Sequence, residues 1–143
     1  MEEKNRIKAL QDYLLEVIGN VTSELNINYI DTSSVGDYSL VRLPVQPEEE
    51  KWIVPITINQ EVYNLESVKI YSQDQITNLS NIGFFENLER KIKINNSKKI
   101  LPLIDGIESI GCLNCGALSM TNTNTAVFSI QIKINYREGN ING

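Results

Sequence analysis

The only two cysteines of the chain, Cys112 and Cys115, lie three positions apart in the stretch SIGCLNCGALS. A C-x-x-C spacing is typical of a redox dithiol or half of a zinc site, and small packing residues can share it. Redox dithiols sit at a helix N-terminus, whose dipole lowers the thiol pKa. Here the flanking residues predict a strand, where positions i and i+3 point to opposite faces unless LNCG bulges. We therefore expect two packing residues, with a redox pair and a metal site as alternatives.

Histidine is absent from the chain. This excludes Ser-His-Asp and Cys-His catalysis within one chain, as well as any histidine-ligated metal site. Zinc takes four ligands, so the two cysteines would have to share the ion with another subunit. The acidic run PEEEK (47–51) is typical of a solvated loop, and Glu86 and Glu89 of a helix surface. The sequence thus predicts no catalytic, cofactor-binding or metal-binding residue and no enzymatic activity.

Length and composition predict a single domain over residues 1–143, with a frayed tail at 139–143. Hydrophobic residues make up 41% and charged residues 22%, which is typical of a folded globular protein. The net charge of −5 disfavours nucleic-acid binding, and the densest basic runs, ERKIK and SKK, are short. The charged start MEEKNRIKAL predicts no secretory signal, and no apolar run is long enough to span a membrane. We expect a cytosolic chain with reduced thiols.

Residues 3–19 have the three-and-four spacing of an amphipathic helix that stops at Gly19. Such a stripe indicates a helix docked on a sheet. The predicted apolar face consists of Ile7, Leu10, Leu14, Val17 and Ile18. The predicted solvent face consists of Lys4, Arg6, Lys8, Gln11, Asp12 and Glu16.

Residues 71–96 return to helical spacing. Ser72 and Gln75 form a capping-box pattern at the start, and Gly83 weakens the middle enough to allow two shorter helices. The strongest apolar face of the chain follows, and we expect it to pack in the core. It consists of Phe84, Phe85, Leu88 and Ile92.

Strand patterns occupy much of the remaining sequence. Strands are predicted at 25–31, 38–45 and 52–63. An exposed loop at 46–51 is predicted between the second and the third. Pro55 cannot donate a ladder hydrogen bond, so the third strand should lie at a sheet edge or carry a bulge there. Such an edge could pair with a neighbouring subunit.

The end of the chain predicts a β-hairpin with arms at about 107–118 and 126–137 and a polar turn at 119–125. The second arm alternates strictly between apolar and polar residues, which is typical of a strand with one buried face. Together these elements predict an α+β fold: an antiparallel or mixed sheet, with the N-terminal and central helices packed on one face and a C-terminal β-hairpin.

Three stretches, NIGFFENLERKI (81–92), LPLIDG (101–106) and FSIQIKINYRE (128–138), carry a family likeness. They resemble the minor capsid proteins of phages from Gram-positive bacteria, which are thought to act as tail terminators. The likeness covers most of the chain, and its motifs are packing motifs. The positions that carry it are Phe85, Glu86, Leu88, Leu101, Pro102 and Tyr136. No role transfers from the family to the C-x-x-C.

The resemblance implies a subunit of a hexameric ring that caps the tail tube, stops its polymerisation and joins it to the neck or head connector. The implied partners are copies of the chain, the tail tube, the neck protein and a sheath protein. No membrane is implied, and DNA would pass through the ring without specific binding. The protein would lie in the virion, assembled in the bacterial cytoplasm, and similar proteins occur in headless contractile particles.

Two polar loops, 45–52 and 119–126, are candidates for contacts with a neighbouring subunit or the tube. The residues singled out there are Gln46, Pro47, Glu48, Glu49, Glu50, Trp52, Met120, Asn122 and Asn124. Two other functions stay open at this point: another neck or baseplate ring component of the same particle, and a small cytosolic thiol-redox protein that uses the C-x-x-C.

Overall fold

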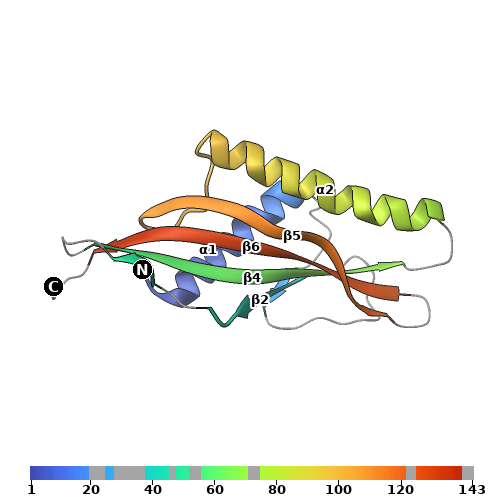
Figure 1. Cartoon of the computed structure of the whole chain (residues 1–143), viewed down its shortest axis with the longest axis horizontal. Coiled ribbons are helices and arrows are strands. Elements are labelled where there is room, and N and C mark those ends of the chain that lie inside the picture. The colour runs from blue at the N-terminus through green and yellow to red at the C-terminus, as the bar shows by residue number, and fades with distance from the viewer. Residues whose placement is uncertain are drawn as a thin grey trace.

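The computed structural model describes residues 1–19, 25–27, 38–45, 48–51, 56–70, 75–121 and 125–139. For 48–51, 75–81, 114–121 and the ends of some strands it describes the backbone alone. The chain forms an α+β fold in which two helices pack on one face of a sheet (Figure 1). The elements in chain order are α1 (Glu3–Ile18), β1 (Leu25–Ile27), β2 (Tyr38–Leu43), β3 (Glu48–Lys51), β4 (Ile56–Ile70), α2 (Gln75–Ser97), β5 (Ile107–Thr121) and β6 (Thr125–Gly139).

The sheet is mixed, with strand order β1-β2-β4-β6-β5. β1 and β2 are parallel, and the other pairs are antiparallel. β3 pairs with β4 on the same side as β2, and α2 runs along β5 at the opposite edge (Figure 1). At 15 residues each, β4, β5 and β6 would reach about 50 Å if regular.

The core lies between the helices and one face of the sheet. On β6 the alternating residues from Ala126 to Tyr136 are buried, as the period-two pattern predicted. Phe85 of α2 packs on Phe128 of β6, with 5.8 Å between ring centroids. The other large contributors are Leu10, Leu14, Leu40, Tyr63, Leu65, Leu88, Ile92, Ile130, Ile132 and Ile134. Val127, which the pattern placed on the wet face, is also buried.

Both predicted helices are confirmed, with small changes. α1 ends at Gly19, whose left-handed φ of 73° lets its N–H bond the Leu15 carbonyl. α2 runs without a break through Gly83, so the alternative of two shorter helices is wrong. Ser72 of the predicted capping box lies outside the described residues.

Two strand predictions need correction. Glu48–Lys51 forms β3 instead of an exposed loop, because pairing with residues 57–59 of β4 provides its backbone with partners despite three glutamates. The segment 52–63 is not an edge strand over its described part, since β4 has β6 on one side and β2 and β3 on the other. Pro55, which suggested an edge, lies outside the described residues.

The hairpin is longer than predicted, and its first strand is irregular. The pairing of β5 with β6 shifts register at four places, two of which flank Asn114. LNCG therefore does interrupt the regular strand, as the sequence allowed. The Asn96 side chain of α2 also accepts a hydrogen bond from the Ile110 N–H of β5 (2.9 Å). Bulges and such a side-chain cap both discourage another strand from adding to this edge.

Candidate functional site

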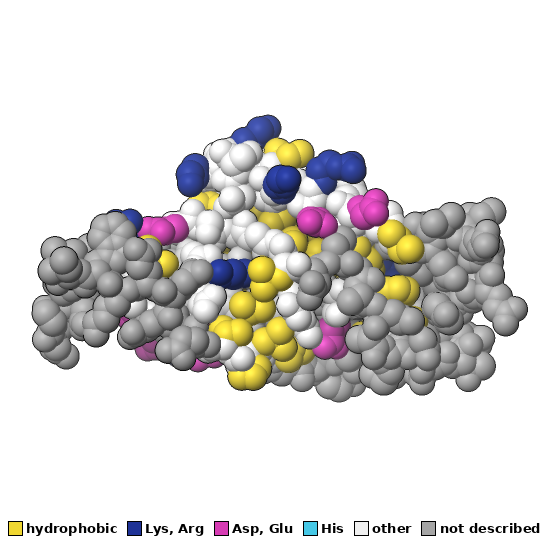
Figure 2. Space-filling model, in the orientation of Figure 1, with side chains coloured by type: hydrophobic (Ala, Val, Ile, Leu, Met, Phe, Trp, Pro, Cys, Tyr) yellow, Lys and Arg dark blue, Asp and Glu magenta, His cyan; other side chains and the backbone are white. Residues whose placement is uncertain are grey.

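Basic and apolar side chains gather where α2 ends. Figure 2 shows Lys and Arg side chains together over the C-terminal half of α2, with hydrophobic side chains between them. All of these residues are exposed, and Leu103 reaches 87%. We call this set the α2-end surface. It consists of Arg90, Lys91, Lys93, Ile94, Lys98, Lys99, Ile100 and Leu103.

The local sequence explains why these apolar residues face outward. Phe85, Leu88 and Ile92 recur at spacings of three and four and point into the core, which places Ile94 on the other side of the helix. The helix then ends in a Schellman motif, in which the Ile100 N–H bonds the Asn95 carbonyl (2.8 Å) and the Lys99 N–H bonds the Asn96 carbonyl (3.2 Å). Lys99 takes the left-handed conformation that glycine usually fills (φ 59°).

A surface groove of about 620 Å³ adjoins the α2-end surface, between α1 and α2. Its lining is mainly apolar, with Glu16 and Lys91 of opposite charge among the residues around it. The contributing residues are Tyr13, Glu16, Val17, Lys91, Ile94, Asn95, Ile100, Leu101 and Leu103. Burial raises the pKa of the Tyr13 phenol, so its hydroxyl stays neutral in this wall. An apolar centre with a charged rim is the usual anatomy of a protein–protein contact.

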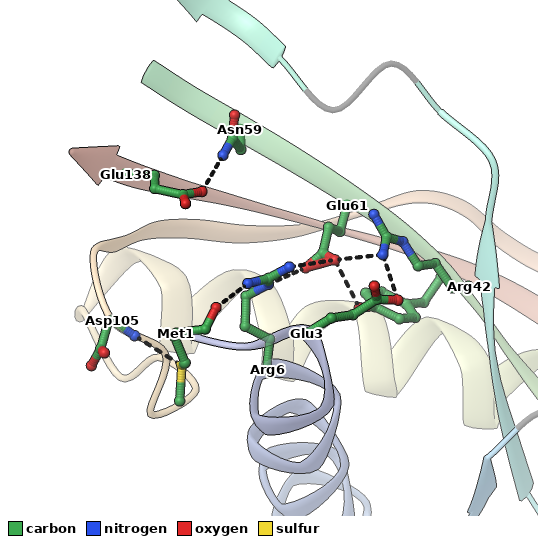
Figure 3. Close-up of polar contacts among 9 residues, drawn as sticks. Met1, Glu3, Arg6, Arg42, Asn59, Glu61, Asp105 and Glu138 are labelled. Carbon is green, nitrogen blue, oxygen red and sulfur yellow. Dashed lines mark hydrogen bonds and ion pairs between the residues drawn. The ribbon is translucent and has the colours of Figure 1, made fainter. Parts of the chain in front are cut away.

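A buried ion-pair cluster fixes α1 on the sheet (Figure 3). Glu61 of β4 is fully buried, and its Oε1 accepts a hydrogen bond from Arg6 Nε at 2.7 Å. Arg42 Nη1 of β2 lies 3.3 Å from Glu61 Oε2 and 2.5 Å from Glu3 Oε1. The Tyr63 hydroxyl also donates to Glu61 at 3.4 Å, and its pKa is raised by burial first and by the Glu61 charge second.

This cluster is a structural support. Two guanidinium groups surround one carboxylate, and Arg6 also lies over the Tyr136 ring, 4.7 Å from its centroid. Burial lowers the pKa of Arg6, but the hydrogen bond and charge of Glu61 outweigh it and the net shift is upward. The sequence prediction that Arg6 lies on the solvent face of α1 is therefore wrong. A buried partner on β4 draws the side chain inward.

The cysteines do not form a constellation within the described residues. Cys112 is half-buried in β5, opposite Ile132 of β6. For Cys115 only the backbone is described, also in β5. The motif thus lies in an irregular strand and not at a helix N-terminus, so no helix dipole activates the thiol. Among the described side chains, no three His, Cys, Asp or Glu residues lie close enough to hold a metal ion.

The residues singled out from the sequence are spread over the fold. Phe85, Leu88, Pro102 and Tyr136 are buried, Leu101 is half-buried and Glu86 is exposed. Glu48, Glu49 and Glu50 lie in β3, and Met120 in β5, each described by its backbone only. The predicted loop residues Gln46, Pro47, Trp52, Asn122 and Asn124 lie outside the described residues.

Sequence reasoning missed the α2-end surface. The runs ERKIK and SKK looked short, but both lie at the end of α2, and Ile100, directly after SKK, lines the same groove as Lys91 of ERKIK. The available signal was that Ile94 and Ile100 are apolar within a basic segment and fall off the core stripe.

The sequence matches no family model and no curated protein. Among the helices in the described part of the chain, none is both long and apolar enough to cross a membrane.

Proposed function

We propose that the protein is a structural subunit of a phage tail, a tail terminator that forms a ring, caps the tail tube and joins it to the neck. The observation that carries the proposal is the α2-end surface: exposed apolar residues with a basic rim, held on a rigid helix that packs along β5. A surface of this kind binds another protein through side chains, without catalysis.

The family likeness supports the same function. Its apolar signature positions Phe85, Leu88 and Tyr136 belong to one core cluster, and Leu101 packs against it. The motifs therefore serve to hold the two helices on the sheet, as packing motifs of a ring subunit would. The ring would contain six copies, touch tube, sheath and neck proteins, and lie in the virion tail. DNA would only pass through it, because the chain has a net charge of −5.

Disruption of the gene in a host that produces the particle tests the proposal. Loss of a terminator leaves tail tubes of uncontrolled length without a neck, and re-expression of the protein restores a uniform length. Loss of a baseplate component, the alternative within the same particle, would instead prevent tube assembly. Tubes of normal length with necks attached would refute both assignments.

A further inference from the structure

Charge is strongly segregated along this chain. Residues 90–99 hold five of the thirteen Lys and Arg residues and no Asp or Glu. The remaining eight basic residues are accompanied by all eighteen acidic ones, so the rest of the molecule is far more acidic than the net charge of −5 suggests. All five of these basic residues are exposed. The end of α2 therefore attracts negatively charged groups, whereas the acidic remainder of the molecule repels them.

The opposite edge of the sheet has complementary character. β3 contains three consecutive glutamates and pairs with β4 on the side away from β6 and β5. Beside it, Val41 and Leu43 of β2 are only half-buried and Pro44 is exposed. Figure 2 shows hydrophobic side chains gathered over β2 and β4. We call Val41, Leu43, Pro44 and Glu48–Lys51 the β2–β3 edge.

The α2-end surface and the β2–β3 edge are complementary in charge, and both contain apolar residues. The α2-end surface is apolar and basic, the β2–β3 edge combines apolar residues of β2 with the glutamate-rich sequence of β3, and they lie at opposite sides of the sheet (Figure 1). A contact between two copies through these surfaces leaves one of each surface free, so further copies can add in the same direction. Such a head-to-tail contact closes into a ring when the rotation between copies allows it.

We propose that the α2-end surface of one copy docks on the β2–β3 edge of the next copy. This inference rests on the proposed ring function and names the partner of its main surface. Strand addition at β5 is not the means of contact, because register shifts and the Asn96 side chain protect that edge. A nucleic acid is the less favoured occupant, because phosphates would leave Ile94, Ile100 and Leu103 unpaired.

Two reciprocal variants test the contact. Lys91→Glu with Lys93→Glu damages only the α2-end surface, and Glu49→Lys with Glu50→Lys damages only the β2–β3 edge. Each variant alone should self-associate at least about tenfold more weakly than the wild type at low salt, since the two surfaces then no longer carry opposite charge. Mixed together, they retain one intact pair of surfaces and one pair with both charges reversed, so association should be restored. Sedimentation velocity over a concentration series measures this.

A control variant and the possible outcomes distinguish failure of the proposed contact between copies from failure of the proposed tail-terminator function. The double variant Lys4→Glu with Arg137→Glu makes the same charge change outside both surfaces and should associate like the wild type. Circular dichroism checks that each variant is folded. Unchanged association of the α2 variant, or no complex in the mixture, would overturn the contact. Loss of random-sequence duplex DNA binding with intact self-association would assign the surface to a polyanion. A wild type that stays monomeric yet still limits tube length would overturn the contact alone.

Discussion

At the residue scale, the carboxylate of Glu61 is buried between guanidinium groups from two other elements, Arg6 of α1 and Arg42 of β2. Arg42 also pairs with Glu3, so two carboxylates balance two guanidinium groups, and the ion pairs hold the first turn of α1 against the sheet. Removing one partner from such a cluster leaves buried charge without compensation, which costs more than the intact pair contributes.

Glu61→Gln should therefore destabilise the protein by about 3 kcal/mol, because both arginines lose their buried counter-ion. The free energy of unfolding in urea measures the effect. Glu108→Gln is the matched control, since Glu108 pairs with Arg137 at 2.7 Å at a partly exposed site and should cost at most about 1 kcal/mol. Equal effects of the two substitutions would show that the buried cluster has no special role.

The thiols are also a residue-scale question. Cys112→Ser together with Cys115→Ser should leave self-association unchanged, because neither cysteine belongs to the α2-end surface or the β2–β3 edge. Leu103→Asp, which places a charge in the exposed apolar centre, should weaken it. A reversible disulfide in the wild type, with an unusually low thiol pKa on titration, would favour the redox alternative instead.

At the element scale, the end of α2 shapes the candidate site. After the Schellman turn, Ile100 lines the same groove as Lys91 and Ile94. Lys99 takes a left-handed conformation there, which is unfavourable for a residue with a Cβ. The next segment then leads into β5, whose Ile110 N–H is bonded by Asn96.

Lys99→Gly should stabilise the protein by about 1 kcal/mol, because glycine adopts positive φ without a steric penalty. Thermal unfolding measures the change. Lys98→Gly, one position earlier, removes the same charge but has no positive φ to relieve. It should give no gain, and a similar gain at both positions would contradict the strained-turn explanation.

Elements with a strong local pattern could be predicted from the sequence. The stripe of α1 and the alternation of β6 predicted both elements to within about two residues at each end, and predicted their buried faces except at Arg6 and Val127. β3 could not be predicted, because three glutamates carry no strand signal and only pairing with β4 orders them. The Glu61 cluster was hidden for a similar reason, since Arg6 and Arg42 lie 55 and 19 residues before Glu61 and meet it only through the fold.

At the scale of the whole molecule, the sheet separates two surfaces of opposite charge. α2 lies along β5 at one edge, whereas β2 and β3 lie beyond β4 toward the other. A compact subunit with complementary edges is suited to repeat contacts in one direction, as a ring requires. The sequence shows the basic run at 90–99 but not that it lies across the sheet from β3, because that placement depends on how the strands are ordered.

The most direct test of the proposed function is electron microscopy of tail tubes assembled from the tube protein of the same particle, with and without this protein. We expect tubes of limited length that end in a ring when the protein is present, and longer tubes with bare ends when it is absent. Tubes of the same unlimited length in both samples, without added density at their ends, would contradict the proposal.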